Sequence, residues 1–173
     1  SGKIGRMIAD LLSATGDYAV TVADRDEAAL ARLQARLPKV ATARVDADDY
    51  DALLRLLDGS EIVISALAYY HNVTVARAAL ERGVSYFDLT ADDETTRGVR
   101  EFAKGARDGQ VFMPQCGLAP GFVSVIAHDL TRHFDKLDTV RMRVGALPQF
   151  PSNDLKYNLT WSTDGLINEY CNL

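Results

Sequence analysis

Two glycines near the start of the chain have the spacing of a phosphate-binding turn. Gly2 and Gly5 fit the second and third glycines of the pattern G-x-G-x-x-G. Lys3 and Ile4 lie between them. In that pattern, backbone N–H groups and the N-terminus of the following helix face the pyrophosphate of a dinucleotide. The first glycine and the strand before it are absent, so we expect a nucleotide-binding domain that is truncated at its N-terminus.

An acidic residue follows this turn at the distance expected of a ribose-binding carboxylate. Asp24 ends an apolar run 19 residues after Gly5 (24 − 5), and roughly 20 residues are typical. Its charge would repel a 2′-phosphate, which favours NAD over NADP, although Arg25 could offset part of that repulsion. The turn, the strand and the acid together predict a dinucleotide site, with NAD as the cofactor and NADP as the alternative.

Further candidates follow later apolar runs, where ligands bind in open α/β sheets. Asp46 would lie near the adenine or would cap the next helix. Ser65 and Ala66 have small side chains that would let the backbone approach a cofactor. Tyr70 and His71 come soon after, and they could form a pocket wall with a titratable group. The alternative for His71 is that it caps the helix that follows.

Two more residues could meet a substrate. Asp88 lies at the end of an apolar run, where it could face the substrate or cap a helix; we prefer the first role and expect Asp92 and Asp93 to cap. Cys116 opens a glycine- and proline-rich loop, and its thiol could contact a ligand or fill a small buried space. No neighbouring His or Asp supports a nucleophilic role for Cys116.

Strand-like and helix-like patterns alternate along most of the chain. Repeated units with continuously apolar strands predict a parallel sheet with helices on both faces. The fold class is therefore α/β, a Rossmann-type doubly wound sheet whose first strand is missing. The expected strands are 18–23, 41–45, 61–65, 85–88 and 110–113, and the expected helices are 4–12, 30–37, 50–57, 73–81, 93–106 and 122–130.

The pattern changes near residue 137. Apolar and polar residues alternate over 137–145, which predicts a half-exposed strand, and 157–161 is a second strand candidate. We therefore expect an NAD(P)-binding domain at 1–135 and the start of a mixed α/β substrate and dimerisation domain at 136–173, truncated at its C-terminus. Because the sheet would lack its central strand, we do not expect residues 1–173 to form a working enzyme alone.

Composition narrows the function classes. Hydrophobic residues make up 47% and charged residues 25% of the chain, as in ordinary soluble proteins. The net charge of −5 argues against nucleic acid as the main partner. No apolar run approaches the roughly 20 residues that span a bilayer, so we expect no membrane contact. The spacing of Cys116, Cys171, His128 and His133 suggests no metal site, and a reduced, cytoplasmic protein is expected.

Four segments resemble the saccharopine dehydrogenase family: 63–72, 83–90, 116–121 and 161–170. Within that family the chain looks most like the short bacterial members that are similar to L-lysine 6-dehydrogenase. The resemblance covers nearly the whole chain. One departure concerns Ala119, which stands where saccharopine reductases often have Asp.

The resemblance implies a homodimeric dehydrogenase of amino-acid metabolism. Hydride would pass between NAD or NADP and an amino-acid substrate such as L-lysine or saccharopine, with oxidation of its C–N bond. The implied cofactor contacts are Gly2, Lys3, Ile4, Gly5, Asp24, Arg25, Ser65 and Ala66, with Gly117 as a further candidate. The implied substrate-side residues are Tyr70, Asp88, Cys116, Gly117, Trp161 and Asn168.

Hydride leaves best from a carbon that bears a neutral amine, so a base is needed. Asp88 or His71 is the candidate base, and Lys156 could bind a substrate carboxylate. Two other functions remain open because a fold does not fix a function. One is a non-catalytic NAD(P)-sensing or partner-binding module, and the other is a reductase acting on a polyamine-type imine.

Overall fold

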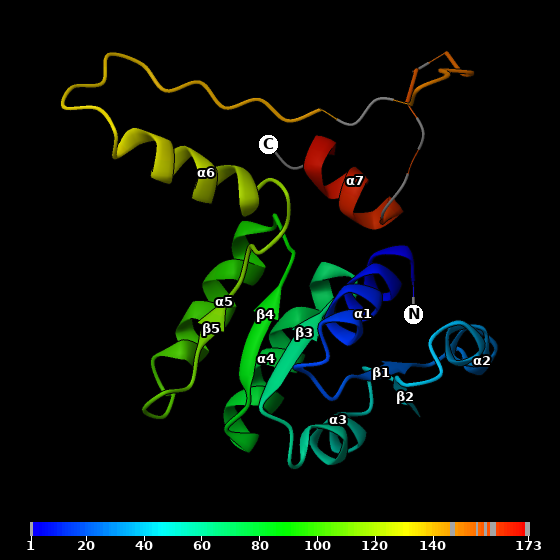
Figure 1. Cartoon of the computed structure of the whole chain (residues 1–173). Coiled ribbons are helices and arrows are strands. Elements are labelled where there is room, and N and C mark those ends of the chain that lie inside the picture. The colour runs from blue at the N-terminus through cyan, green and yellow to red at the C-terminus, as the bar shows by residue number, and fades with distance from the viewer. Residues whose placement is uncertain (1, 146–147, 155, 158, 160–161, 172–173) are drawn as a thin grey trace.

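The chain folds into parallel strands that are joined through helices (Figure 1). The computed structural model describes residues 2–145, 148–154, 156, 157, 159 and 162–171. In this part of the chain, β1 (Thr21–Asp24) pairs with β2 (Ala41–Arg44). A second parallel sheet has the order β3 (Ile62–Ser65), β4 (Ser85–Asp88) and β5 (Phe112–Met113). The doubly wound α/β class predicted from the sequence is confirmed.

The helices alternate with these strands or follow them in the chain. They are α1 (Lys3–Thr15), α2 (Glu27–Arg36), α3 (Tyr50–Leu57), the short 3₁₀ turn η1 (Tyr69–His71), α4 (Asn72–Arg82), α5 (Asp93–Ala103), α6 (Phe122–Thr131) and α7 (Thr163–Cys171). Helix α2 packs on β1 and β2, while α4 packs between α3 and α5 and against β3 and β4. Each strand therefore passes into a helix at its carboxyl end.

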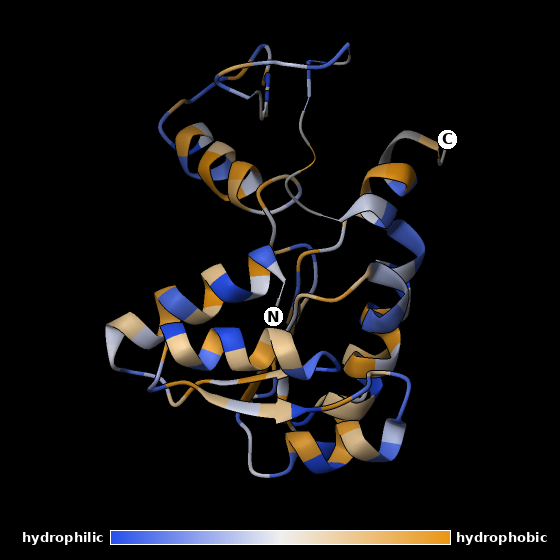
Figure 2. Ribbon diagram, turned by 90° about the vertical axis from the view of Figure 1, so that its right-hand side faces the viewer, coloured by the Kyte–Doolittle hydropathy of each residue, from blue (hydrophilic) through white to orange (hydrophobic). Residues whose placement is uncertain are grey.

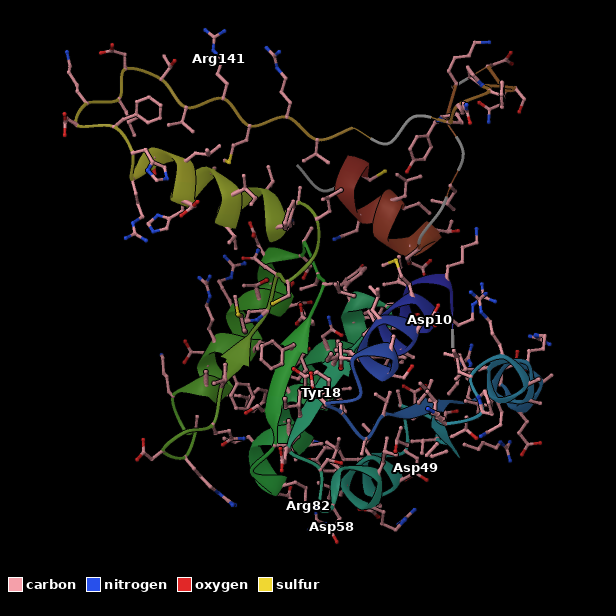
Figure 3. All side chains as sticks on the ribbon, in the orientation of Figure 1. Asp10, Tyr18, Asp49, Asp58, Arg82 and Arg141 are labelled. Atoms are coloured by element: carbon pink, nitrogen blue, oxygen red, sulfur yellow. The ribbon has the colours of Figure 1, made fainter. Side chains whose placement is uncertain are left out.

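Acidic side chains fix where three of these helices begin. Asp26 accepts a hydrogen bond from Ala29 N at 3.0 Å, and Asp49 accepts one from Ala52 N at 2.9 Å. Asp49 is labelled at the start of α3 in Figure 3. The expected cap at Asp92 is confirmed. Such caps contribute about 1 kcal/mol each, because they satisfy N–H groups that have no partner within the helix.

The main core lies between α3, α4 and α5 and the sheet of β3 to β5. Its fully buried members include Tyr86 and Val99, and the Tyr86 ring stacks on Phe112 with centroids 5.9 Å apart. The amphipathic pattern expected for 50–57 places three leucines in this core: Leu53, Leu54 and Leu57. Burying each such side chain contributes about 1.5–3 kcal/mol. The core therefore holds β4 firmly, and β4 carries Asp88 at its end.

The two sheets are separate, and no strand of the described residues lies between β1 and β3. In the usual order of a doubly wound sheet, that position belongs to the first strand. On β3, Ile62 and Ile64 are 48% and 37% exposed. The second sheet thus has one face packed against α4 and another that is only partly covered.

The segment after α6 differs from the sequence-based expectation. Residues 137–145 form no strand, so the predicted strand there is wrong, and Val140 and Met142 are exposed. Alternation alone cannot make a strand, because the backbone needs a neighbouring strand to bond with. Arg141 projects away from the rest of the chain (Figure 3). Most of the candidate strand at 157–161 lies outside the described residues, and the domain boundary at 135 stays a prediction.

Helix α6 also carries apolar residues (Figure 2), and several of them are exposed. They include Phe122, Val125, Ile126 and Leu130. The exposed apolar residues of 137–144 follow it along the chain.

Candidate functional site

The N-terminus of α1 is open toward a potential anion. Gly2 caps the helix without any side-chain hydrogen bond, and the first turn holds no acidic residue. A Cβ at Gly2 would meet nothing within 4 Å, whereas a Cβ at Gly5 would lie 3.8 Å from the Cβ of Ala66. The turn therefore sits against the end of β3. Its backbone N–H groups and the helix dipole fit the pyrophosphate of a dinucleotide.

The carboxyl ends of β1 and β2, called here the β1–β2 end, carry both signs of charge. Asp24 Oδ1 accepts a hydrogen bond from Asp26 N at 2.9 Å, and the exposed Arg25 follows it. Arg44 is the register partner of Asp24, and its Nε lies 3.4 Å from Glu27 Oε1. Sequence reasoning missed Arg44, although two parallel strands that end at the same level would have indicated it.

The loop that holds Asp46 meets the end of η1, where His71 lies. Asp46 Oδ1 accepts a hydrogen bond from Asp48 N at 3.1 Å, which closes an Asx turn. Asp49 caps α3, so the alternative role for Asp46 as that cap is not observed. His71 Nδ1 lies 3.3 Å from Asp48 Oδ1, and the His71 side chain is 19% exposed. The alternative role of His71, in which its side chain would cap α4, is not observed either.

The carboxyl ends of β3 and β4, called here the β3–β4 end, hold a buried polar layer. Ser65 Oγ donates to Asn72 Oδ1 at 2.6 Å. Ser65 is the register partner of Asp88 on the neighbouring strand. The Tyr86 hydroxyl donates to Asp88 Oδ2 at 2.8 Å. All four residues are buried. Burial, then the nearby Asp88, raises the pKa of Tyr86 far above its usual value, so its hydroxyl stays a donor.

Asp88 joins this layer to the loop after β5. Its Oδ1 accepts hydrogen bonds from Thr90 N at 2.9 Å and from Gln115 N at 3.1 Å. Its backbone carbonyl accepts one from Cys116 N at 2.7 Å. A Cβ at Gly117 would lie 3.1 Å from the carbonyl oxygen of Pro120, so only glycine fits easily there. The predicted Asp88, Cys116 and Gly117 are therefore neighbours.

The Cys116 thiol lies 3.2 Å from the Met113 carbonyl oxygen, to which it donates. Burial, together with Asp88, raises the pKa of Cys116. A thiol that resists ionisation is a poor nucleophile. A cavity of about 440 Å³ opens beside it, lined by residues 113–117, 120–122, 124 and 125.

A second cavity, of about 400 Å³, lies between η1 and α7. It brings together Tyr70 and Asn168, both expected on the substrate side, and Asp164 adds a carboxylate that sequence reasoning missed. Asn168 Nδ2 donates to Asp92 Oδ2 at 3.2 Å. Burial opposes ionisation of Asp92, but the hydrogen bonds from Thr95 and Asn168 outweigh it, so the pKa of Asp92 is lowered. Trp161 lies outside the described residues.

Two further classes of site were searched for in the described part of the chain. No group of three His, Cys, Asp or Glu side chains there could hold a metal ion. In the same residues, no helix has the length and apolar character needed to cross a membrane.

Comparisons with known proteins agree with this geometry. Residues 1–113 match the family described as saccharopine dehydrogenase NADP binding domain. Carboxyaminopropylagmatine dehydrogenase of Synechocystis sp. is 27% identical over an alignment of 150 residues that covers 79% of this chain and 38% of that protein. Saccharopine dehydrogenase [NADP(+), L-glutamate-forming] of Saccharomyces cerevisiae is 28% identical over an alignment of 177 residues that covers 96% of this chain and 38% of that protein.

A solved structure matches as well. The apo, histidine-tagged saccharopine dehydrogenase (L-Glu forming) from Saccharomyces cerevisiae superposes with a TM-score of 0.65 at 26% identity, and the match covers 77% of this chain and 29% of that one. The chain thus spans well under half the length of the relatives that it matches.

Proposed function

The chain belongs to the saccharopine dehydrogenase NADP binding domain family, and from that membership we propose that it is the coenzyme-binding part of an NAD(P)-dependent oxidoreductase. The observation that carries this proposal is the N-terminus of α1, which has no side-chain cap and opens beside the end of β3. A bound nicotinamide would supply the redox chemistry by accepting or donating a hydride. The protein would bind and orient the two reactants.

The residues present can be assigned to the successive parts of such a coenzyme. Gly2, Lys3, Ile4 and Gly5 would hold the pyrophosphate through backbone N–H groups. The predicted ribose contacts are Asp24 and Arg25, the predicted adenine neighbour is Asp46, and the predicted contacts nearer the nicotinamide are Ser65, Ala66 and Gly117.

The choice between NAD and NADP depends on the charges at the β1–β2 end. The Asp24 carboxylate favours a free 2′-hydroxyl, whereas Arg25 and Arg44 would attract a 2′-phosphate. The family description and the name of the yeast relative both specify NADP. We propose that either coenzyme binds and that Asp24 sets their ratio.

The substrate would enter the cavity between η1 and α7. Tyr69, Tyr70 and Asp164 line it, together with Asn168. No Lys or Arg of the described residues lines it, so an amine with positive charge would be drawn in. We propose oxidation of the C–N bond of an amino acid such as L-lysine or saccharopine. A homodimeric, cytoplasmic enzyme is part of the same proposal.

The base that takes the amine proton stays a prediction, with His71 and Asp88 as its candidates. His71 has the better position, because its ring is partly exposed and lies 4.5 Å, centroid to centroid, from the Tyr70 ring. Asp48 would hold the Nδ1–H, so that Nε2 accepts the proton. Asp88 is fully buried.

One relative gives a second candidate function. Carboxyaminopropylagmatine dehydrogenase is named for a polyamine-type substrate and matches 79% of this chain. A reductase that acts on a polyamine-type imine would use the same coenzyme residues. A non-catalytic NAD(P)-sensing module is the remaining alternative.

The test uses the full-length protein. Binding of NADH and NADPH is measured by nicotinamide fluorescence, and turnover is followed by the absorbance of reduced nicotinamide with L-lysine, saccharopine and carboxyaminopropylagmatine. We expect coenzyme binding and turnover of one of the three. Tight binding without any turnover would favour the sensing module.

A matched pair of variants checks the pyrophosphate site. Gly2→Asp should weaken coenzyme binding by about tenfold or more, since it places a negative charge beside the helix N-terminus. Gly145→Asp adds the same charge at another open position and should leave binding unchanged. Equal affinities in both variants would contradict the proposed pyrophosphate site.

A further inference from the structure

We propose that Asp88 is a positioning residue: its carboxyl group, backed by Tyr86, holds the turn at residues 115–117 in place and takes no proton from the substrate. This inference rests on the proposed function, because the turn borders the predicted site. It assigns to Asp88 a different role from that of the candidate base.

Every part of Asp88 that could act chemically is already engaged inside the protein. The residue is fully buried. Its Oδ2 accepts from the Tyr86 hydroxyl, and its Oδ1 accepts from the backbone N–H groups of Thr90 and Gln115. A general base must come within hydrogen-bond reach of the proton that it removes. A carboxyl group that is buried and bonded three times does not meet that requirement.

The turn that Asp88 holds needs such support. Gln115 has a φ of 64°, in the left-handed region of the backbone that residues other than glycine rarely adopt. Its N–H bonds to the Asp88 carboxyl group, and the next N–H, of Cys116, bonds to the Asp88 carbonyl oxygen at 2.7 Å. One residue therefore fixes two consecutive peptide groups of the turn. Cys116 and Gly117 then line the cavity of about 440 Å³.

The same buried layer extends to the second predicted contact region. Ser65, the register partner of Asp88, donates to Asn72 at the start of α4, directly after η1. The Ser65 side chain also lowers the pKa of the Tyr86 hydroxyl, against the larger effects of burial and of Asp88. Tyr86 is therefore close to both Ser65 and Asp88. The buried polar layer therefore connects both the turn at 115–117 and the η1 segment to the same strand pair, β3 and β4.

Two substitutions at Asp88 separate positioning from proton transfer. Asp88→Asn keeps an Oδ1 acceptor for Thr90 N and Gln115 N, whereas Asp88→Ala leaves both donors without a partner. In the full-length protein, with the substrate of the three that is turned over, we expect Asp88→Ala to lower kcat by at least about thirtyfold. Asp88→Asn should recover most of that loss. If both variants lose activity equally, the proposal is overturned in favour of a base.

A second readout works without turnover, so that a failure of the proposed function can be told apart. The rate at which iodoacetamide alkylates Cys116 is measured by mass spectrometry of its peptide. We expect Asp88→Ala to raise this rate about tenfold above that of Asp88→Asn, which removes the same charge but keeps the acceptor for the turn, and we expect Tyr86→Phe to raise the rate over the unsubstituted protein by less. Equal rates in Asp88→Ala and Asp88→Asn would overturn the proposal, because the lost charge and not the loosened turn would then account for the reactivity of the thiol.

The control for these rates is Val99→Ala. Val99 is fully buried in the same core, and its side chain forms no hydrogen bond with the polar layer. The substitution Val99→Ala should lower the overall stability without changing the alkylation rate of Cys116 under native conditions. A rise equal to that of Asp88→Ala would show that general destabilisation, and not the loss of this tether, frees the turn.

Discussion

The β1–β2 end and the β3–β4 end hold their polar side chains in different ways. At the β1–β2 end, Asp24 and Asp46 accept hydrogen bonds from the N–H groups two residues further on. At the β3–β4 end, Asn72 and Asp88 are buried, and Gln115, which donates to Asp88, lies 27 residues away in the sequence. The carboxylates of the first end are held by residues that are close in the sequence, and the carboxylate of the second end is held by a residue that is distant in the sequence.

This difference suits the two ends to different tasks. Exposed side chains held by short loops can adjust to the hydroxyl or phosphate groups of a ribose at little cost. A buried layer cannot adjust, because breaking one of its hydrogen bonds leaves a polar group without a partner. Hydride transfer needs reacting atoms to be held within a narrow range of distances. The rigid end therefore lies where we expect the reaction.

The largest contrast should come from one substitution made in both sheets, in the middle of β4 and just before β1. Tyr86→Ala removes a fully buried ring and the donor to Asp88, and should lower the free energy of unfolding by about 3–5 kcal/mol. Tyr18→Ala, just before β1, removes a ring that is 52% exposed and should change it by less than about 1 kcal/mol. Urea unfolding of the full-length protein measures both. Similar losses would show that the sheet of β3 to β5 is not held more firmly than the sheet of β1 and β2.

A polar pair should give the next largest contrast. Asn72→Ala leaves the buried Ser65 hydroxyl without its acceptor and should cost about 1–3 kcal/mol of unfolding free energy. Asp46→Ala opens an Asx turn at an exposed loop and should cost less than about 1 kcal/mol. Thermal unfolding of the two variants in parallel measures both losses of stability. A greater loss in Asp46→Ala would reverse the comparison.

The same division explains what could be predicted from the sequence. The helix 50–57 and the strand 85–88 were placed correctly, and so was the cap at Asp92, because their signals are local. The hydrogen bonds to Asp24 and Asp46 come from N–H groups two residues further on, and the place of Asp24 at the end of β1 was predicted correctly, while its contact with a ribose stays a prediction. Asp88 was correctly expected at the end of its strand.

The remaining features depend on parts of the chain that are distant in sequence. The bond from Asn168 to Asp92 joins residues 76 positions apart, and no periodicity predicts it. The strand predicted at 137–145 is wrong for a similar reason. A strand needs a neighbouring strand to bond with, and the alternating pattern does not indicate which one. Tyr86 could have been found, because residues two apart on a strand share one face.

A smaller effect should separate the two ends by function. Asp24→Ser removes the charge that repels a 2′-phosphate while Arg25 and Arg44 remain, so kcat/KM with NADP relative to NAD should rise by about tenfold. The stability should hardly change. Ser65→Ala, at the β3–β4 end, should lower stability and leave the coenzyme ratio unchanged. A ratio that does not move in Asp24→Ser would show that Asp24 is not the ribose acid.

The smallest effect concerns Asp92, which also bonds to a residue of a distant helix, unlike the other acidic helix caps of the described residues. Its pKa is lowered in the folded protein, so its contribution to stability is present above the pKa of the unfolded chain and is lost as pH falls through the lower folded value. Asn168→Ala removes one of the hydrogen bonds that lower this pKa. The folded pKa of Asp92 should rise toward its unfolded value, so the stability that Asp92 contributes should become smaller and its loss in acid should be complete at a higher pH.

The pKa of Asp92 is measured by NMR titration of its carboxyl carbon in the two proteins. Ile167→Ala, at the neighbouring exposed position on α7, serves as the control for altered helix packing. If Ile167→Ala moves the pKa of Asp92 as far as Asn168→Ala does, the position of α7 and not its hydrogen bond controls the carboxyl group. Asp92 would then behave as the locally built caps do, and the long-range bond would add little to the rigid end.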